Sequence, residues 1–198
     1  MRLILASQSA SRRAMLTHAG VPHEAMAAGV DEEALKAGLR ADGHEARALA
    51  DALAEFKATK LSLRNPGALV LGCDSTVATA DGAPIDKAES REAAAAQLRA
   101  LRGATHRLFS AAVICQAGSP VWRHVDGAKL TMRDFSDGFL DAYLDAEWPA
   151  IGGCVGGYRL EGRGAQLFSK IEGSHFTILG LPLLPLLDYC RVRGVLPA

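Results

Sequence analysis

The sequence predicts an α/β fold in which helices flank a mixed central sheet. Short apolar runs of strand length recur along the chain, and Ala-rich runs with a helical period lie between them. This alternation is typical of α/β proteins. No internal repeat or low-complexity linker interrupts the 198 residues. We therefore expect residues 1–198 to form a single domain with two lobes, without a boundary that the sequence marks.

The first part of the chain is expected to begin with a short strand that leads into a helix. Leu3 to Ala6 are apolar, small polar residues follow, and helical character runs from Arg12 to Ala19. Asp31 to Glu33 are expected in a polar turn. Glu45 to Leu61 is Ala-rich with a helical period, and Asn65-Pro66-Gly67 ends the helix predicted there.

Strands and helices continue to alternate after this break. Ala68 to Cys73 is typical of a buried strand, which is expected to end at Asp74, and a short hairpin then turns at Asp81-Gly82. A helix from Ser90 to Leu101 follows, with Ser90 as its N-cap. The remaining expected elements are an antiparallel strand pair at Arg107–Gln116 and Val121–Met132, a helix at Ser136–Ala146, a short strand at Ala165–Ile171 and a helix after Pro182.

Charge and cysteine usage narrow the classes of function. Lysine and arginine together number 22, as do aspartate and glutamate, so no basic excess points to nucleic acid or to an anionic membrane. The four cysteines are widely spaced and lack the short spacing of zinc sites. The sequence has no recognisable signal peptide and no apolar run of membrane-spanning length. We expect a cytoplasmic protein with no nucleic-acid or membrane partner.

Polar residues gather directly after the first predicted strand. Ser7 and Ser9 lie where the helix is expected to begin, and Arg12 and Arg13 follow at its start. Backbone N–H groups at a helix start, together with serine hydroxyls and arginines, can bind phosphate oxygens. Ordinary helix capping with two solvated arginines explains the same pattern equally well.

Three further residues could take part in phosphate chemistry. Asp74 follows a buried strand, and a carboxylate at such a position can bind Mg²⁺ or activate water. Lys87 in a short loop could neutralise phosphate charge, and Glu32 could supply a metal ligand. Each has an ordinary alternative, namely an aspartate that caps a turn, a solvated lysine and a surface glutamate.

The sequence lacks several other nucleotide-binding and catalytic motifs. It contains no Walker P-loop and no Gly-x-Ser-x-Gly elbow, and the glycines from Gly152 to Gly157 lack the spacing of a dinucleotide fingerprint. The histidines show no metal-pair spacing, and His106 and His175 are expected to be structural.

The order of the motifs along nearly the whole chain resembles the Maf-like family. The opening Leu5-Ala6-Ser7-Gln8-Ser9, with Arg12-Arg13 after it, is similar to the family signature Leu-Ala-Ser-x-Ser-Pro-x-Arg. The further matches, in the family's order, are Val30-Asp31-Glu32, Lys57-Ala58, Gly72-Cys73-Asp74, Lys87, Leu101-Arg102-Gly103-Ala104-Thr105-His106, Gly156-Gly157-Tyr158 to Glu161-Gly162, Ile171-Glu172-Gly173-Ser174 and Gly180-Leu181-Pro182.

This resemblance implies a fold, an activity and a set of roles. The family has an elongated α/β fold with a cleft between two lobes, and its members commonly form homodimers. They cleave nucleotides between the α- and β-phosphates with Mg²⁺ or a similar cation such as Mn²⁺. By position, Asp74 would activate water and, with Glu32, contact the metal. The residues that would bind the triphosphate or complete the polar site are Ser7, Ser9, Arg12, Arg13, Glu32, Lys57 and Lys87.

Five positions depart from the family pattern or bear on the choice of base. Ala10 and Ala88 stand where the family has proline, which softens two turns and removes no functional group. Ser11, Ser75 and Glu161 occupy positions linked with base selection. The dTTP and UTP branch typically has Arg, Thr and Gln there, and the 7-methyl-GTP branch has Trp, Gln and Glu. Glu161 therefore favours the 7-methyl-GTP branch, whereas the two serines match neither.

A function of another class stays open at this point. Members of the family have also been associated with arrest of septum formation, so the chain could be a nucleotide-sensing regulator with little turnover. Such a regulator would share the site with a housecleaning pyrophosphatase. The intact Asp74 and Lys87 favour the enzyme.

Overall fold

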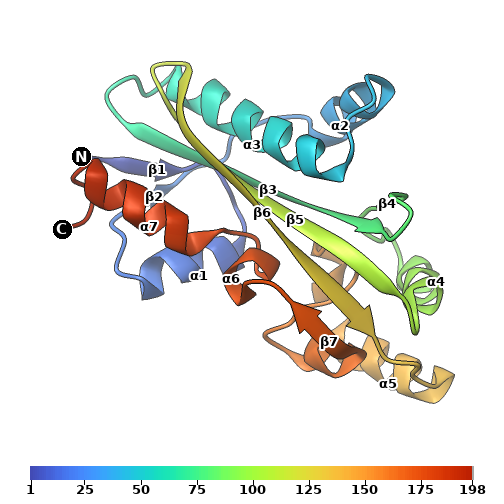
Figure 1. Ribbon diagram of the computed structural model, residues 1–198. Helices are drawn as coiled ribbons and strands as arrows, with labels where there is room; N and C mark the ends of the chain where they lie inside the picture. The colour runs from blue at the N-terminus through green and yellow to red at the C-terminus, as the bar shows by residue number, and fades with distance from the viewer. Residues whose placement is uncertain (198) are drawn as a thin grey trace. The chain divides into compact units, whose positions relative to one another are not determined.

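The computed structural model describes residues 1–197 and has the mixed α/β class expected from the sequence (Figure 1). The strands are β1 Leu3–Leu5, β2 Glu24–Ala25, β3 Leu69–Thr79, β4 Pro84–Ile85, β5 Thr105–Gln116, β6 Ser119–Met132 and β7 Phe168–Glu172. The helices are α1 Ala10–His18, α2 Glu32–Ala41, α3 Ala46–Ser62, α4 Arg91–Leu101, α5 Asp137–Glu147, α6 His175–Ile178 and α7 Leu183–Val192, with 3-10 turns η1 Ala150–Gly153 and η2 Arg163–Leu167.

The strands of the described residues form one mixed sheet in the order β2-β1-β3-β5-β6-β7, and β4 pairs with β3. β1 runs parallel to both of its neighbours, so that Ile4 pairs with Glu24 on one side and with Val70 on the other. β3 and β4 are antiparallel, with Val77 opposite Ile85. The hairpin expected around Asp81-Gly82 is therefore present.

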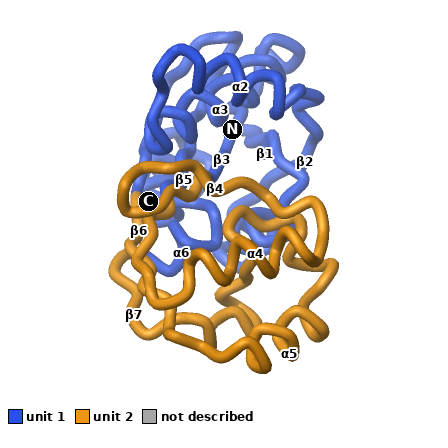
Figure 2. The backbone as a smooth tube through the Cα atoms, turned by 90° about the vertical axis from the view of Figure 1, so that its right-hand side faces the viewer, with its two compact units in different colours: residues 1–75, 109–126, 174–198 blue, residues 76–108, 127–173 orange. Residues whose placement is uncertain are grey.

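The chain divides into two compact units, which Figure 2 colours separately. The first unit comprises Met1–Ser75, Phe109–Asp126 and the segment from Ser174 onward. It holds β1, β2, α1, α2, α3, α6 and α7. The second unit comprises Thr76–Leu108 and Gly127–Gly173.

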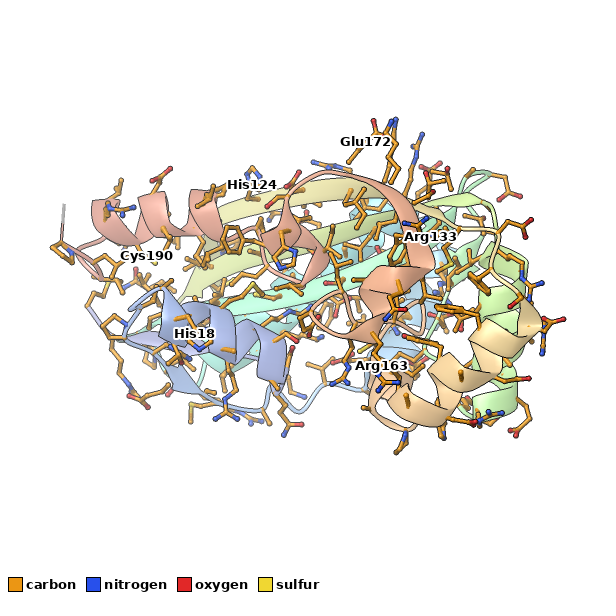
Figure 3. All side chains as sticks on the ribbon, turned by 90° about the horizontal axis from the view of Figure 1, so that it is seen from below. His18, His124, Arg133, Arg163, Glu172 and Cys190 are labelled. Atoms are coloured by element: carbon orange, nitrogen blue, oxygen red, sulfur yellow. The ribbon has the colours of Figure 1, made fainter. Side chains whose placement is uncertain are left out.

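Helices cover both faces of the sheet in the first unit. On one face, Leu3 and Leu5 of β1 pack with Leu16 of α1 and Leu186 of α7; Figure 3 marks these two helices by His18 and Cys190. On the other face, Ile4 packs with the end of α3. Successive strand residues point to opposite faces, so an uninterrupted apolar strand such as Leu-Ile-Leu requires helices on both sides.

The second unit has its own buried aromatic cluster. His106 Nε2 lies 2.8 Å from the Tyr158 hydroxyl, and the Tyr158 and Phe168 rings meet edge to face with centroids 4.9 Å apart. Burial lowers the pKa of His106 to about 4, because the apolar surroundings disfavour the imidazolium form. His106 is therefore neutral at physiological pH.

Four local expectations were wrong. Asp31–Glu33 do not form a plain turn, because Asp31 caps α2 by accepting a hydrogen bond from Ala34 N at 3.1 Å. β3 does not end at Asp74 but continues to Thr79, where pairing with β4 extends it. The first helix begins at Ala10 rather than at Arg12, since Ser9 is its N-cap. Residues 165–167 belong to η2, and the last strand begins only at Phe168.

Among the described residues, no helix is both long and apolar enough to span a membrane.

Candidate active site

The centre of the candidate site depends on a close approach between α3 and β3. A Cβ atom at Gly72 would lie 2.0 Å from the carbonyl oxygen of Ala54 and 2.8 Å from the backbone nitrogen of Ala58. Only glycine permits backbone contact at such a distance. Residue 74 lies on the same face of the strand as residue 72. The contact thus brings Lys57 of α3 over Asp74.

Lys57 joins two carboxylates from different elements. Its Nζ lies 2.6 Å from Asp74 Oδ1 in β3 and 2.8 Å from Glu32 Oε1 in the first turn of α2. The side chains of Lys57 and Asp74 are 7% and 8% exposed, whereas that of Glu32 is 37% exposed. Three predicted site residues that are far apart in the sequence are therefore in direct contact.

The geometry leaves Asp74 able to act on a water molecule. The hydrogen bond from Lys57 engages Oδ1 of its carboxylate, which leaves Oδ2 to accept a proton. A single ammonium between two carboxylates leaves the trio with a formal charge of −1, which favours a further cation beside it. The neighbouring Cys73 is no competing nucleophile, because burial raises the pKa of its thiol to about 11.

The two serines of the opening motif lie at the start of α1. Ser9 is the N-cap, and its hydroxyl accepts a hydrogen bond from Arg12 N at 3.4 Å. The hydroxyl oxygen of Ser7 accepts from Ser9 N at 3.2 Å and from Arg12 Nη1 at 3.4 Å. Since both lone pairs of Ser7 Oγ are engaged, its proton is the group that remains to donate to a ligand.

Arg12 is directed into the protein by several hydrogen bonds. Its Nε donates to the Gly180 carbonyl at 2.8 Å, its Nη1 donates to the Cys73 carbonyl at 3.1 Å, and its Nη2 donates to Ser75 Oγ at 2.9 Å. Together with the bond to Ser7, four of the five N–H groups of a guanidinium have protein partners. Arg13, by contrast, is exposed.

Two further predicted site residues belong to the second unit. These are Lys87 and Glu161, and both are exposed. Both influence the thiol of Cys154. Burial is the largest cause that raises its pKa, and Glu161 raises it further, whereas Arg159 and Lys87 lower it. Arg159 is held by the buried Glu147, with Nη2 2.7 Å from Oε2.

The ion pair between Arg159 and Glu147 was not predicted from the sequence. They lie in different segments, and no spacing rule links a residue at the end of a helix to one in the loop that follows. The half-buried Ser11 and Ser75, predicted to bear on base selection, both lie in the first unit.

The donor set around Lys57 suits a hard divalent cation. Mg²⁺ is usually held by one or two carboxylates together with phosphate oxygens of the substrate, and the carboxylates of Asp74 and Glu32 converge on one point. Within residues 1–197, no group of three or more His, Cys, Asp or Glu side chains has the arrangement of a metal site.

Comparison with known proteins identifies the family. A family model described as Maf-like protein matches residues 2–192. A nucleoside triphosphate pyrophosphatase of Caulobacter vibrioides is 53% identical over 192 residues, which cover 97% of this chain and 96% of the relative. A protein of the same name from Sphingopyxis alaskensis is 51% identical over 197 residues and covers both chains completely.

A HAM1 protein from Coxiella burnetii is a more distant match among solved structures. It has a TM-score of 0.45 and 14% identity, and the match covers 68% of this chain and 74% of that one.

The chain belongs to the Maf-like protein family. The family predicted from the sequence is thus confirmed.

Proposed function

We propose that this chain hydrolyses nucleoside triphosphates to the monophosphate and pyrophosphate. The observation that carries the proposal is the buried Asp74 carboxylate, whose Oδ1 lies 2.6 Å from Lys57 Nζ. The relatives from Caulobacter vibrioides and Sphingopyxis alaskensis carry the name of this activity. Neither relative is named as a regulator of septum formation, and no feature of the site favours that alternative over the enzyme.

Asp74 is the general base in this proposal. Lys57 holds one carboxylate oxygen by a charge-assisted hydrogen bond, which fixes the direction of the other. That second oxygen accepts a proton from a water molecule as the water attacks the α-phosphorus, and pyrophosphate departs. A positioned general base typically contributes about 10²- to 10⁴-fold to the rate.

The triphosphate is proposed to be bound by serine, arginine and lysine side chains. In the first unit, the Ser7 hydroxyl and the start of α1 at Ser9 face the phosphates, with the remaining N–H of Arg12 and the exposed Arg13. By the family resemblance, the exposed Lys87 supplies a further cation. Cations and N–H groups aimed at the bridging and terminal oxygens stabilise the charge that develops on the leaving pyrophosphate.

A divalent cation, Mg²⁺ or Mn²⁺, is proposed as the cofactor. Asp74 and Glu32 would hold it together with phosphate oxygens, because the two carboxylates around the single ammonium of Lys57 leave a formal charge of −1. When bound, it supplies neutralisation of phosphate charge. Lys57 keeps the two carboxylates in place, and Asp74 Oδ2 keeps its role as proton acceptor.

The base is proposed to be recognised by Glu161, Ser11 and Ser75, with a preference for 7-methyl-GTP over dTTP. A carboxylate accepts hydrogen bonds from the guanine N–H groups, and N7-methylation makes that ring cationic, which strengthens them. Thymine presents two carbonyl oxygens and a single N–H, so it offers the carboxylate fewer donors. We expect the Glu161→Gln variant to narrow or reverse this preference.

The expected setting is a cytoplasmic homodimer with a housecleaning role in nucleotide metabolism. The experiment that tests the activity is pyrophosphate release from a panel of 7-methyl-GTP, dTTP, UTP and CTP with Mg²⁺ or Mn²⁺. Turnover of at least one nucleotide to its monophosphate supports the proposal, and dTTP as the best substrate would contradict the base preference alone. Absence of turnover across the panel with either metal would contradict the enzyme itself.

A further inference from the structure

A chain of hydrogen bonds in the first unit begins at Arg12 and ends in the backbone of α6. Arg12 Nη2 donates to Ser75 Oγ at 2.9 Å, Ser75 Oγ and Ser110 Oγ lie 2.8 Å apart, and Ser110 Oγ donates to the Thr177 carbonyl at 2.7 Å. Ser110 and Thr177 are completely buried. Ser110 lies outside the family motifs.

The direction of this chain is fixed by proton counting. A serine hydroxyl has one proton, and that of Ser110 is given to the Thr177 carbonyl. Ser75 must therefore donate its own proton to Ser110, and it accepts from Arg12. The far end is anchored as well, because Thr177 Oγ1 donates to Asp126 Oδ2 of β6 at 2.6 Å. Removing one hydroxyl interrupts the whole chain.

Arg12 holds β3 from the face opposite to Asp74. Side chains alternate along a strand, so the side chain of Ser75 lies on the face of α1, whereas Asp74 meets Lys57 on the face of α3. From its own face, Arg12 binds the carbonyl of Cys73 and the hydroxyl of Ser75, the residues directly before and after Asp74. The backbone on both sides of Asp74 is thereby fixed.

The bonds of Arg12 to Cys73 and Ser75 form a clamp on β3, and Gly180 belongs to this clamp. Its carbonyl accepts from Arg12 Nε at 2.8 Å. A Cβ atom at this position would lie 3.2 Å from Arg12 Nε and 3.3 Å from Ser75 Oγ, and its φ of +105° is one that glycine adopts readily. The contact is close enough that a side chain would press on both groups that hold β3.

We propose that Ser110 is a positioning residue of the active site. Through Ser75 and Arg12, it sets the backbone that carries Asp74 and so the direction of the carboxylate. The inference rests on the proposed function, in which Asp74 is the general base. A displacement of about 1 Å in such a group can lower a rate by about 100-fold, so an intact fold with a loosened clamp loses turnover rather than substrate affinity.

The test compares Ser110→Ala with the matched control Ser62→Ala. Ser62 is also completely buried in the first unit, donates to the Thr59 carbonyl at 2.9 Å and accepts from Gly118 N at 3.0 Å. Both variants are expected to lower the urea midpoint. Only Ser110→Ala is expected to lower kcat, by about 10- to 100-fold, with KM changed less than about twofold.

A double-mutant cycle separates positioning from general loss of stability. Ser75→Ala already breaks the link to Arg12, so adding Ser110→Ala to it should lower kcat no further. Ser75→Ala should lower kcat for every nucleotide of the panel, and Ser75→Thr, which keeps the hydroxyl, should recover most of that loss. If Ser110→Ala does not fold, the pair Ser75→Ala and Ser75→Thr gives the answer.

The possible outcomes distinguish this inference from the proposed function. If the wild-type chain releases no pyrophosphate from any nucleotide, the proposed function fails. If the wild type is active but Ser110→Ala keeps the kcat of Ser62→Ala, the positioning role of Ser110 is refuted. A kcat loss in Ser75→Ala confined to one nucleotide would equally overturn it, because it would assign Ser75 to base selection alone.

Discussion

Replacing Gly72 by alanine tests whether the spacing between α3 and β3 forms the site. The new Cβ would lie 2.0 Å from the Ala54 carbonyl oxygen, and ordinary contact begins at 3.4 Å. The obstacle is helix backbone, which no side-chain rotation can relieve. We therefore expect α3 to retreat by up to about 1.4 Å, the difference of those two distances, at a cost of about 1–3 kcal/mol for overpacking.

The retreat has a direct consequence for Lys57. Its Nζ now lies 2.6 Å from Asp74 Oδ1, and a shift of about 1 Å takes the pair out of hydrogen-bond range. Asp74 then loses its fixed direction, and kcat for pyrophosphate release should fall by about 100-fold.

The assay is steady-state pyrophosphate release together with urea unfolding, with Gly138→Ala as the matched control. A Cβ atom at Gly138, in α5, meets no atom within 4 Å, and alanine in a helix is expected to stabilise by about 0.5–1 kcal/mol. Wild-type stability and turnover in Gly72→Ala would refute the reasoning, because the strand could then tolerate a side chain without moving the helix.

Two further predictions concern charge. Arg12→Ala should raise the barrier to hydrolysis by about 2–4 kcal/mol, and Arg13→Ala should do less because Arg13 is exposed; equal losses in kcat/KM would show that the signature arginine is misaligned. The pKa of His106 is lowered by burial to about 4 from an ordinary 6.5, so the unfolded state binds its proton more readily. The free energy of unfolding should therefore fall, by up to about 3 kcal/mol, as the pH drops from about 6.5 to 4. The His106→Phe variant should lack this component in urea titrations at several pH values, and an unchanged slope would contradict it.

The sequence predicted the larger elements well, because strong periodicity dominates in them. The helices after Glu45 and after Ser90 appear as α3 and α4. α2 was missed although Leu35 and Leu39 recur one helical turn apart on its half-buried side, and its buried residue is Lys36. The better signal was the cap: Asp31 followed by two glutamates in the first turn is typical of a helix start.

The contacts among the candidate site residues could be predicted only in part. Motif order identified Asp74, Lys57 and Glu32, but their contact depends on the approach of α3 to Gly72, which no local pattern encodes. The hydrogen-bond partners of Arg12 could not be predicted from the sequence either. Its partners Cys73 and Gly180 contribute backbone carbonyls, which carry no signature in the sequence.

The most direct test of the central claim is pyrophosphate release by the Asp74→Asn variant with the best nucleotide of the panel. Asparagine keeps the size of the side chain and can still accept a bond from Lys57, but it cannot take a proton from water. Asp188→Asn, at an exposed residue of α7 in the same unit, is the control and should leave turnover unchanged. We predict a fall in kcat of about two to four orders of magnitude for Asp74→Asn, with a cooperative urea transition retained. A folded variant that keeps more than about a tenth of wild-type kcat would contradict the assignment of Asp74 as the base.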